Sequence, residues 1–184
     1  MAAFVLNVPN ALTLLRFALV PAIALALLRG DPLLALLLFA LSALSDAIDG
    51  HLARRWNQRT RFGAVADPLA DKLTMLTVGV LLAWQGALPW WFVAAVVGRD
   101  LLIVAGALAY HLRFGRVEMA PTLLSKANTG LEFTLLLGVL AIGAGLLPDG
   151  SWRLLLLYLT LATIVASGLH YVVVWGRKAL QAAA

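Results

Sequence analysis

Six long, mostly apolar stretches follow one another along the chain, and short polar or glycine- and proline-containing segments separate them. A helix needs roughly 20 apolar residues to cross the hydrocarbon core of a bilayer, which is about 30 Å thick. The pattern therefore predicts an all-α integral membrane protein with six transmembrane helices, forming a single membrane domain over residues 1–184. The predicted spans are residues 11–28, 33–53, 69–86, 89–112, 128–147 and 154–175.

The segments between these stretches indicate how the chain is oriented. Turn residues separate spans one and two, three and four, and five and six. Residues 54–62 are polar and basic, and together with the residues on either side they form a loop of about a dozen residues between spans two and three. Lys and Arg gather in this second loop, in the fourth loop and in the C-terminal tail. Short loops rich in Lys and Arg stay in the cytoplasm, so we expect both termini to be cytoplasmic.

Composition supports lipid as the surrounding medium. Apolar residues make up 62% of the chain and charged residues 12%, far from the balance of a soluble domain. The net charge of +5 comes from residues lying between apolar runs, which favours membrane lipid as a partner and argues against nucleic acid. Cysteine is absent, which excludes disulfides and cysteine-ligated metals.

Four aspartates occur where the second predicted span ends and the third begins. Asp46 and Asp49 are three residues apart, and Asp67 and Asp71 are four apart, so each pair shares one helix face. One such pair alone is also typical of a helix cap or a solvated face. Antiparallel neighbouring spans would bring all four together, and such a cluster near lipid is costly unless cations neutralise it. Carboxylate oxygens favour Mg²⁺, Mn²⁺ or Ca²⁺.

The aspartates belong to a longer string of specified residues. It reads Asp46-x-x-Asp49-Gly50-x-x-Ala53-Arg54, then eight residues, then Gly63-x-x-x-Asp67-x-x-x-Asp71. A second string near the start reads Pro9-Asn10-x-Leu12-Thr13-x-x-Arg16. Together with the six-span plan, these strings resemble the CDP-alcohol phosphatidyltransferase family.

The resemblance implies a metal-dependent membrane enzyme, commonly a homodimer, whose site opens to the cytoplasm. It implies two divalent cations, Mg²⁺ or Mn²⁺, that hold the diphosphate of a CDP-linked donor such as CDP-diacylglycerol. Asp71 would also be the catalytic base. The implied metal ligands are Asp46, Asp49, Asp67 and Asp71. The positions implied around the donor are Gly50, Ala53, Arg54 and Gly63. The expected location is the cytoplasmic (inner) membrane of a bacterium.

Charged residues elsewhere in the spans are candidates for binding the acceptor. Arg99 lies near the middle of the fourth span and Lys126 at the mouth of the fifth, and together they could hold an acceptor phosphate. An ion pair within the bundle, for example with Asp100, explains Arg99 without any ligand. Snorkelling or ion pairing explains Arg16 and Glu132 about as well as function does.

The choice of acceptor depends on similarity to two branches of the family. Residues 54–58 and 67–72 are similar to both phosphatidylglycerophosphate synthases and CMP-forming cardiolipin synthases, whereas residues 99–103, 121–122, 125–129 and 176–178 are more similar to the latter. The expected reaction therefore transfers a phosphatidyl group to phosphatidylglycerol, giving cardiolipin and CMP. The alternative acceptor is glycerol 3-phosphate, giving phosphatidylglycerophosphate.

A cation transporter is the alternative from a different class. It would place charged or broken-helix positions near the bilayer midplane in two related halves of the chain. Here the acidic residues gather towards one end of two spans, and the sequence has no visible internal repeat. The pattern therefore favours the enzyme.

Overall fold

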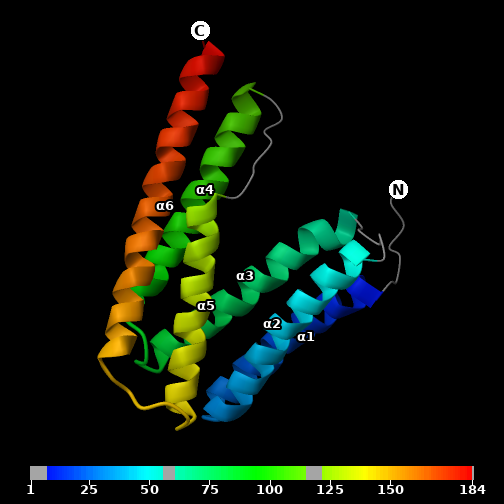
Figure 1. Ribbon diagram of the computed structural model, residues 1–184, viewed down its shortest axis with the longest axis vertical. Helices are drawn as coiled ribbons and strands as arrows, with labels where there is room; N and C mark the ends of the chain where they lie inside the picture. Colours follow the sequence, from blue (N-terminus) through cyan, green and yellow to red (C-terminus); the bar gives the residue numbers. More distant parts are fainter. Residues whose placement is uncertain (1–7, 56–60, 115–121, 184) are drawn as a thin grey trace. The chain divides into compact units, whose positions relative to one another are not determined.

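The protein is an all-helical chain in the regions that the computed structural model describes, residues 8–55, 61–114 and 122–183 (Figure 1). Side chains are described for residues 10–48, 63, 65–113 and 122–174. The helices are α1 (Val8–Leu28), α2 (Pro32–Arg55), α3 (Arg61–Trp84), α4 (Trp90–Phe114), α5 (Leu123–Gly143) and α6 (Ser151–Ala183).

Each predicted span corresponds to one of these helices, but the predicted boundary between the second and third was wrong. α2 continues to Arg55 and α3 begins at Arg61, so residues 56–60 alone lie between them and the expected loop of a dozen residues is too long. α3 runs through Pro68, which directly precedes the predicted start of this span. Proline is tolerated inside membrane helices because neighbouring groups can satisfy the freed carbonyl. Gly63 and Asp67 are therefore part of the helix.

Three helices are long and apolar enough to cross a membrane among the residues described: Asn10–Leu28, Trp90–Arg113 and Ser151–Val174. The apolar part of α2, Pro32–Ile48, is shorter. α3 and α5 contain charged residues within their length, among them Asp71 and Glu132. These features fit an integral membrane protein, whereas six crossings and the orientation of the termini remain predictions.

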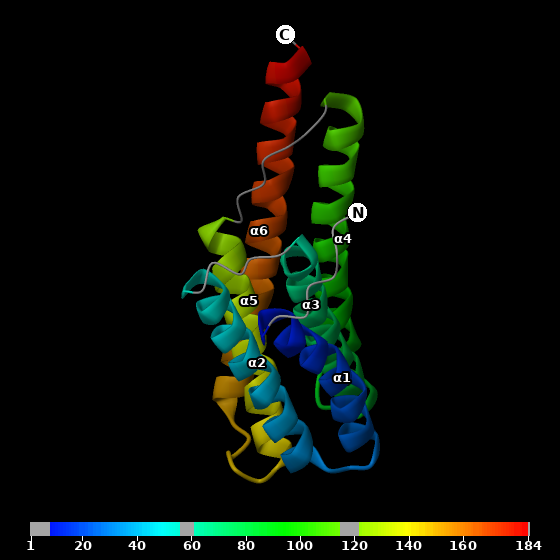
Figure 2. The same ribbon diagram turned by 90° about the vertical axis from the view of Figure 1, so that its right-hand side faces the viewer.

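The first of two compact units contains α1, α2, α3 and the end of α5 from Leu136. α1 packs along both α2 and α3, while α2 and α3 touch each other only marginally, and both views show α1 beside α2 (Figures 1 and 2). Small residues at the helix interfaces, such as the fully buried Ala35 and Ala70, allow close approach of the backbones. Phe39 is among the largest side chains that are almost fully buried.

The second unit contains α4, the first part of α5 up to Leu135, and α6. α4 and α6 lie side by side, as both views show (Figures 1 and 2). Thr163 of α6 donates a hydrogen bond of 2.9 Å to the side-chain oxygen of Asn128, which is buried on α5. Polar contacts therefore connect the helices of this unit in addition to apolar packing.

Glycines end three of the helices with the same turn. Gly30, Gly86 and Gly145 have φ angles of 72°, 76° and 71°, which side chains with a Cβ rarely adopt. In each case the next residue donates its N–H to the carbonyl five positions earlier, as in a Schellman ending. After the first of these turns, Asp31 Oδ1 caps α2 by accepting the N–H of Leu34 at 2.9 Å. The turns predicted at residues 30–32 and 86–89 are confirmed here, whereas the third turn is made by Gly145 and the predicted residues 148–150 follow it in the loop.

Candidate functional site

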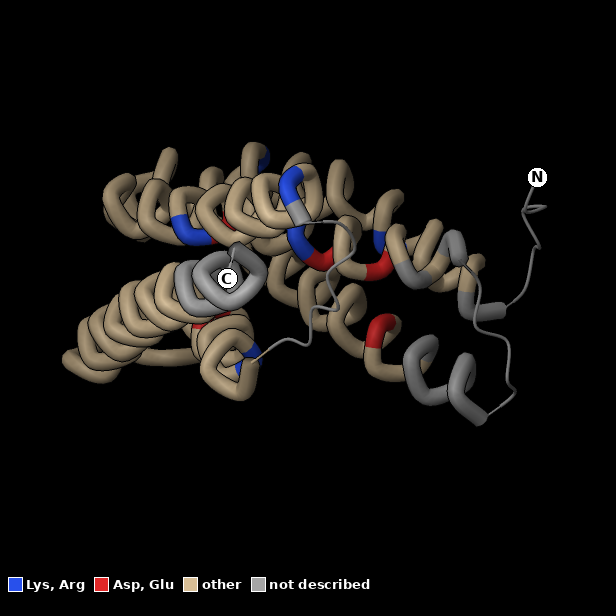
Figure 3. The backbone as a smooth tube through the Cα atoms, turned by 90° about the horizontal axis from the view of Figure 1, so that it is seen from above, with Lys and Arg blue, Asp and Glu red and all other residues tan. Residues whose placement is uncertain are grey.

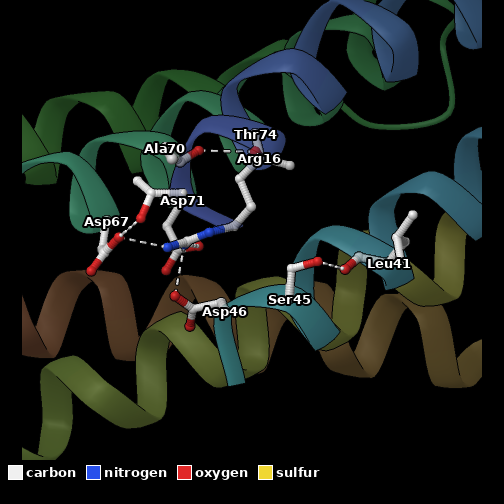
Figure 4. A network of polar contacts seen from close by, with 9 residues as sticks. Arg16, Leu41, Ser45, Asp46, Asp67, Ala70, Asp71 and Thr74 are labelled. Atoms are coloured by element: carbon white, nitrogen blue, oxygen red, sulfur yellow. Dashed lines mark hydrogen bonds and ion pairs between the residues drawn. The ribbon is translucent and has the colours of Figure 1, made fainter. Parts of the chain in front are cut away.

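Three of the four predicted aspartates converge on one arginine in the first unit. The guanidinium of Arg16 reaches Asp46 Oδ1 from NH1 at 2.7 Å, Asp71 Oδ1 from NH1 at 3.0 Å and Asp67 Oδ1 from NH2 at 2.9 Å. Figure 4 shows the three carboxylates around this guanidinium. Arg16 comes from α1, Asp46 from α2 and the other two from α3. One side chain therefore joins three helices through ionic hydrogen bonds.

A buried polar face of α1 supports this arrangement. Asn10, Thr13 and Arg16 are three residues apart, lie on one side of the helix and are all buried. Thr13 Oγ1 donates a hydrogen bond of 2.6 Å to Asp67 Oδ1, the same oxygen that Arg16 contacts. The position of the Asp67 carboxylate is therefore set by two donors from α1.

The cluster has a closed side and an open side. The side chain of Arg16 is 0% exposed, whereas those of Asp46, Asp67 and Asp71 are 41%, 37% and 47% exposed. Three carboxylates against one guanidinium leave an excess of negative charge. A cation or a metal-bound ligand could therefore reach the carboxylates from outside without passing the arginine.

The donor set fits hard divalent cations, which prefer several carboxylate oxygens. Within the described part of the chain, however, no three acidic or histidine side chains are arranged as a ready-made metal site. The carboxylates are oriented towards the guanidinium instead. Asp46, Asp67 and Asp71 are thus chemically suited to hold a divalent cation, in competition with Arg16.

Neighbouring polar side chains on α2 and α3 make only local bonds. Ser45 donates to the carbonyl of Leu41, and Thr74 donates to that of Ala70 (Figure 4). Both side chains are buried, and the hydroxyl of each donates its hydrogen bond to a carbonyl on the preceding turn of its own helix.

The structure describes only one of the residues predicted around the donor. This residue is Gly63, which is buried on α3, and its place in the donor site stays a prediction. Four further residues are on α2, where the helix is described but the side chains are not: Asp49, Gly50, Ala53 and Arg54. Their predicted roles in binding the metal and the donor are not tested.

The predicted acceptor residues, Arg99 and Lys126, belong to the second unit. The guanidinium of Arg99 is buried and donates to Asp100 Oδ1 at 2.8 Å, to Ser125 Oγ at 2.5 Å and to Ser167 Oγ at 3.2 Å. The ion pair with Asp100, which was the alternative explanation of Arg99, is confirmed. Lys126 is exposed in the first turn of α5. Binding of an acceptor phosphate by these two residues stays a prediction.

Charged positions are sparse along the described helices (Figure 3). Sequence reasoning found the aspartates but missed Arg16 as their partner, and it missed Ser125 and Ser167 as partners of Arg99. The spacing of Asn10, Thr13 and Arg16 was the available signal, since three polar residues on one face of an apolar helix must find buried partners.

Comparison with known proteins identifies the family. The family model for CDP-alcohol phosphatidyltransferase matches residues 6–175. The chain therefore belongs to the CDP-alcohol phosphatidyltransferase family.

Similar proteins carry two kinds of name. The chain is 34% identical over 191 residues to the probable cardiolipin synthase (CMP-forming) of Drosophila melanogaster, covering 91% of this chain and 57% of that protein. It is 30% identical over 191 residues to the human cardiolipin synthase (CMP-forming), covering 95% and 63%. It is 43% identical over 105 residues to the CDP-diacylglycerol--glycerol-3-phosphate 3-phosphatidyltransferase of Pectobacterium atrosepticum, covering 54% and 57%. The chain spans about three fifths of the length of these curated relatives.

The hydrogen bond between Arg99 and Ser167 is expected to stabilise the second unit measurably. In a double-mutant cycle, Arg99→Met and Ser167→Ala should show a coupling of about 0.5–1.5 kcal/mol in the free energy of unfolding, since the bond is buried and charge-assisted. Unfolding in mixed detergent micelles measures it. The same cycle with Thr134→Val, whose hydroxyl donates to the carbonyl of Gly130, should be additive. Additivity in both cycles would show that the bond with Ser167 contributes nothing.

Proposed function

We propose that the chain catalyses the metal-dependent transfer of a phosphatidyl group from CDP-diacylglycerol to phosphatidylglycerol, giving cardiolipin and CMP. The observation that carries this proposal is the cluster of Asp46, Asp67 and Asp71, whose open side offers three carboxylates in a chain of this family. The relatives named cardiolipin synthase match over nearly the whole chain, which supports this acceptor.

In the proposed reaction, one acceptor hydroxyl replaces CMP on the phosphorus that bears the diacylglycerol. The hydroxyl oxygen forms the new bond to this phosphorus, and the bond between the phosphorus and the bridging oxygen breaks. CMP departs with the bridging oxygen, and the hydroxyl proton passes to a carboxylate oxygen of Asp71. No covalent enzyme intermediate is needed, since the chain has no cysteine and no serine flanked as in a nucleophile elbow.

The remaining residues bind and orient the substrates in this proposal. Divalent cations held by Asp46, Asp49, Asp67 and Asp71 would supply charge neutralisation for the diphosphate and the departing CMP. Gly50, Ala53 and Gly63 leave room for the nucleotide to approach the helix backbone, and Arg54 can hold a phosphate through two parallel hydrogen bonds. For the acceptor phosphate, Arg99 and Lys126 remain the candidates.

The setting that we propose is a homodimer in a bacterial cytoplasmic membrane, with six spans, cytoplasmic termini and a site that faces the cytoplasm. The distribution of Lys and Arg supports this orientation. A bacterial relative supports the location. The dimer rests on family resemblance alone.

Glycerol 3-phosphate is the second candidate acceptor. The relative from Pectobacterium atrosepticum, which is named for that substrate, has a higher identity than the fly and human relatives, though over about half of this chain. A basic residue such as Lys126 suits the phosphate of either acceptor.

Chelation is expected to abolish the transfer. Four carboxylates without cations cannot hold an anionic diphosphate, so excess EDTA should stop release of CMP, and Mg²⁺ or Mn²⁺ should restore it. EDTA already saturated with Mg²⁺ is the control and should not inhibit. Full activity in excess metal-free EDTA would contradict the metal mechanism.

Asp71→Asn should lower turnover by at least the roughly 10²- to 10⁴-fold that a general base contributes, because the amide cannot accept the proton. Rates are measured at saturating Mg²⁺, so that weaker metal binding alone does not account for the loss. Asp31→Asn is the matched control. Asp31 caps the start of α2, far along this helix from Asp46, and asparagine can cap a helix as well. Turnover near the unmodified level in Asp71→Asn would exclude Asp71 as the base.

The acceptor is identified from the labelled lipid product. Purified protein in detergent receives CDP-diacylglycerol and Mg²⁺ with either phosphatidylglycerol or glycerol 3-phosphate. We expect cardiolipin with the first acceptor and little product with the second, with Asp71→Asn as the inactive control. Phosphatidylglycerophosphate as the main product would replace the acceptor while keeping the donor and the reaction class.

A further inference from the structure

Arg16 holds one oxygen of each carboxylate that a metal would be expected to use. Its ion pairs with Asp46, Asp67 and Asp71 go to the Oδ1 atoms, at 2.7 to 3.0 Å. We infer that Arg16 is a built-in counter-ion, which holds the carboxylates together in the metal-free protein and keeps their affinity for a free divalent cation low. This inference rests on the proposed function, because it concerns the metal that the proposed function requires.

Arg16 is the buried member of the cluster. Its side chain enters from α1 and is 0% exposed, whereas the three carboxylates are partly exposed. A cation that binds from outside therefore meets carboxylates that already share one positive charge. A cation that coordinates the Oδ1 atoms must displace these contacts with Arg16, and one that coordinates the other oxygens still lies close to its positive charge.

The positive charge of Arg16 has opposite effects on the protein without metal and the protein with metal bound. Without metal, Arg16 offsets repulsion among Asp46, Asp67 and Asp71, which lie within reach of one guanidinium. With metal, the same positive charge repels the incoming cation over a few ångströms. Arg16 therefore stabilises the metal-free fold and opposes metal binding by the same interaction.

The functional consequence is that metal and donor bind together. The diphosphate of the donor brings further oxygen ligands and negative charge, which compensate for the repulsion by Arg16. Free metal is then held weakly, and firm binding requires the donor. Arg16 is a positioning residue in this scheme, since it acts through the carboxylates and not on the reacting atoms.

The test measures Mn²⁺ binding to the full-length chain in detergent at pH 8, by electron paramagnetic resonance and without donor. Arg16→Gln removes the charge while keeping hydrogen-bond donors, and it should bind Mn²⁺ at least about tenfold more tightly than the unmodified chain. In EDTA its Tm should fall by about 4 °C or more, and Mg²⁺ should restore most of the loss. Arg16→Lys keeps the charge and should stay within about threefold of the unmodified affinity.

Arg29→Gln is the matched control, since Arg29 is exposed at the far end of α1, about 20 Å along the helix from Arg16. It should change neither the affinity nor the Tm. Unchanged or weaker Mn²⁺ binding in Arg16→Gln would overturn the inference. The inference would also be overturned if this variant failed to fold in EDTA and Mg²⁺ did not restore its folding. If the unmodified chain binds no Mn²⁺ even with CDP-diacylglycerol, the proposed metal dependence fails as well. Binding by the unmodified chain without tightening in Arg16→Gln removes the inference alone.

Discussion

The first unit depends on the ion pairs that the buried guanidinium of Arg16 makes with three aspartates. A charge removed from water in an apolar bundle must be paired, and the repulsion within a carboxylate cluster must be offset. Arg16 is paired in this way and offsets part of the repulsion, because it reaches Asp46 on α2 and Asp67 and Asp71 on α3. α2 and α3 hardly touch each other, so α1 is what joins them. The site is therefore assembled by the helix that carries none of the aspartates.

The second unit also contains a buried arginine, but most of its partners are neutral. Arg99 is buried, and its donors go to Asp100 on its own helix and to the hydroxyls of Ser125 and Ser167 on α5 and α6. Here a single carboxylate leaves no excess negative charge. These bonds use three of the five N–H donors of the guanidinium, and the two serines fix its orientation between the helices.

The contrast between the two arginines bears on chemistry. At Arg16 the carboxylates outnumber the cation and are partly exposed, so the cluster can still accept positive charge. At Arg99 the charges balance. The carboxylate cluster of the first unit is therefore chemically suited to a divalent cation.

The sequence by itself determined the six helices, two of their three glycine turns and the aspartates of the site, because apolar length, turn residues and the spacing of charges are local properties. It placed the start of α3 too late, at residue 69, because apolar length does not reveal the polar first turns of a helix. Only the tertiary structure decided which cation the aspartates face. Arg16 is 30 residues before Asp46 and 55 before Asp71 along the chain, and the sequence explained it equally well by snorkelling or pairing. The choice depends on how α1 packs between α2 and α3, which no local pattern specifies.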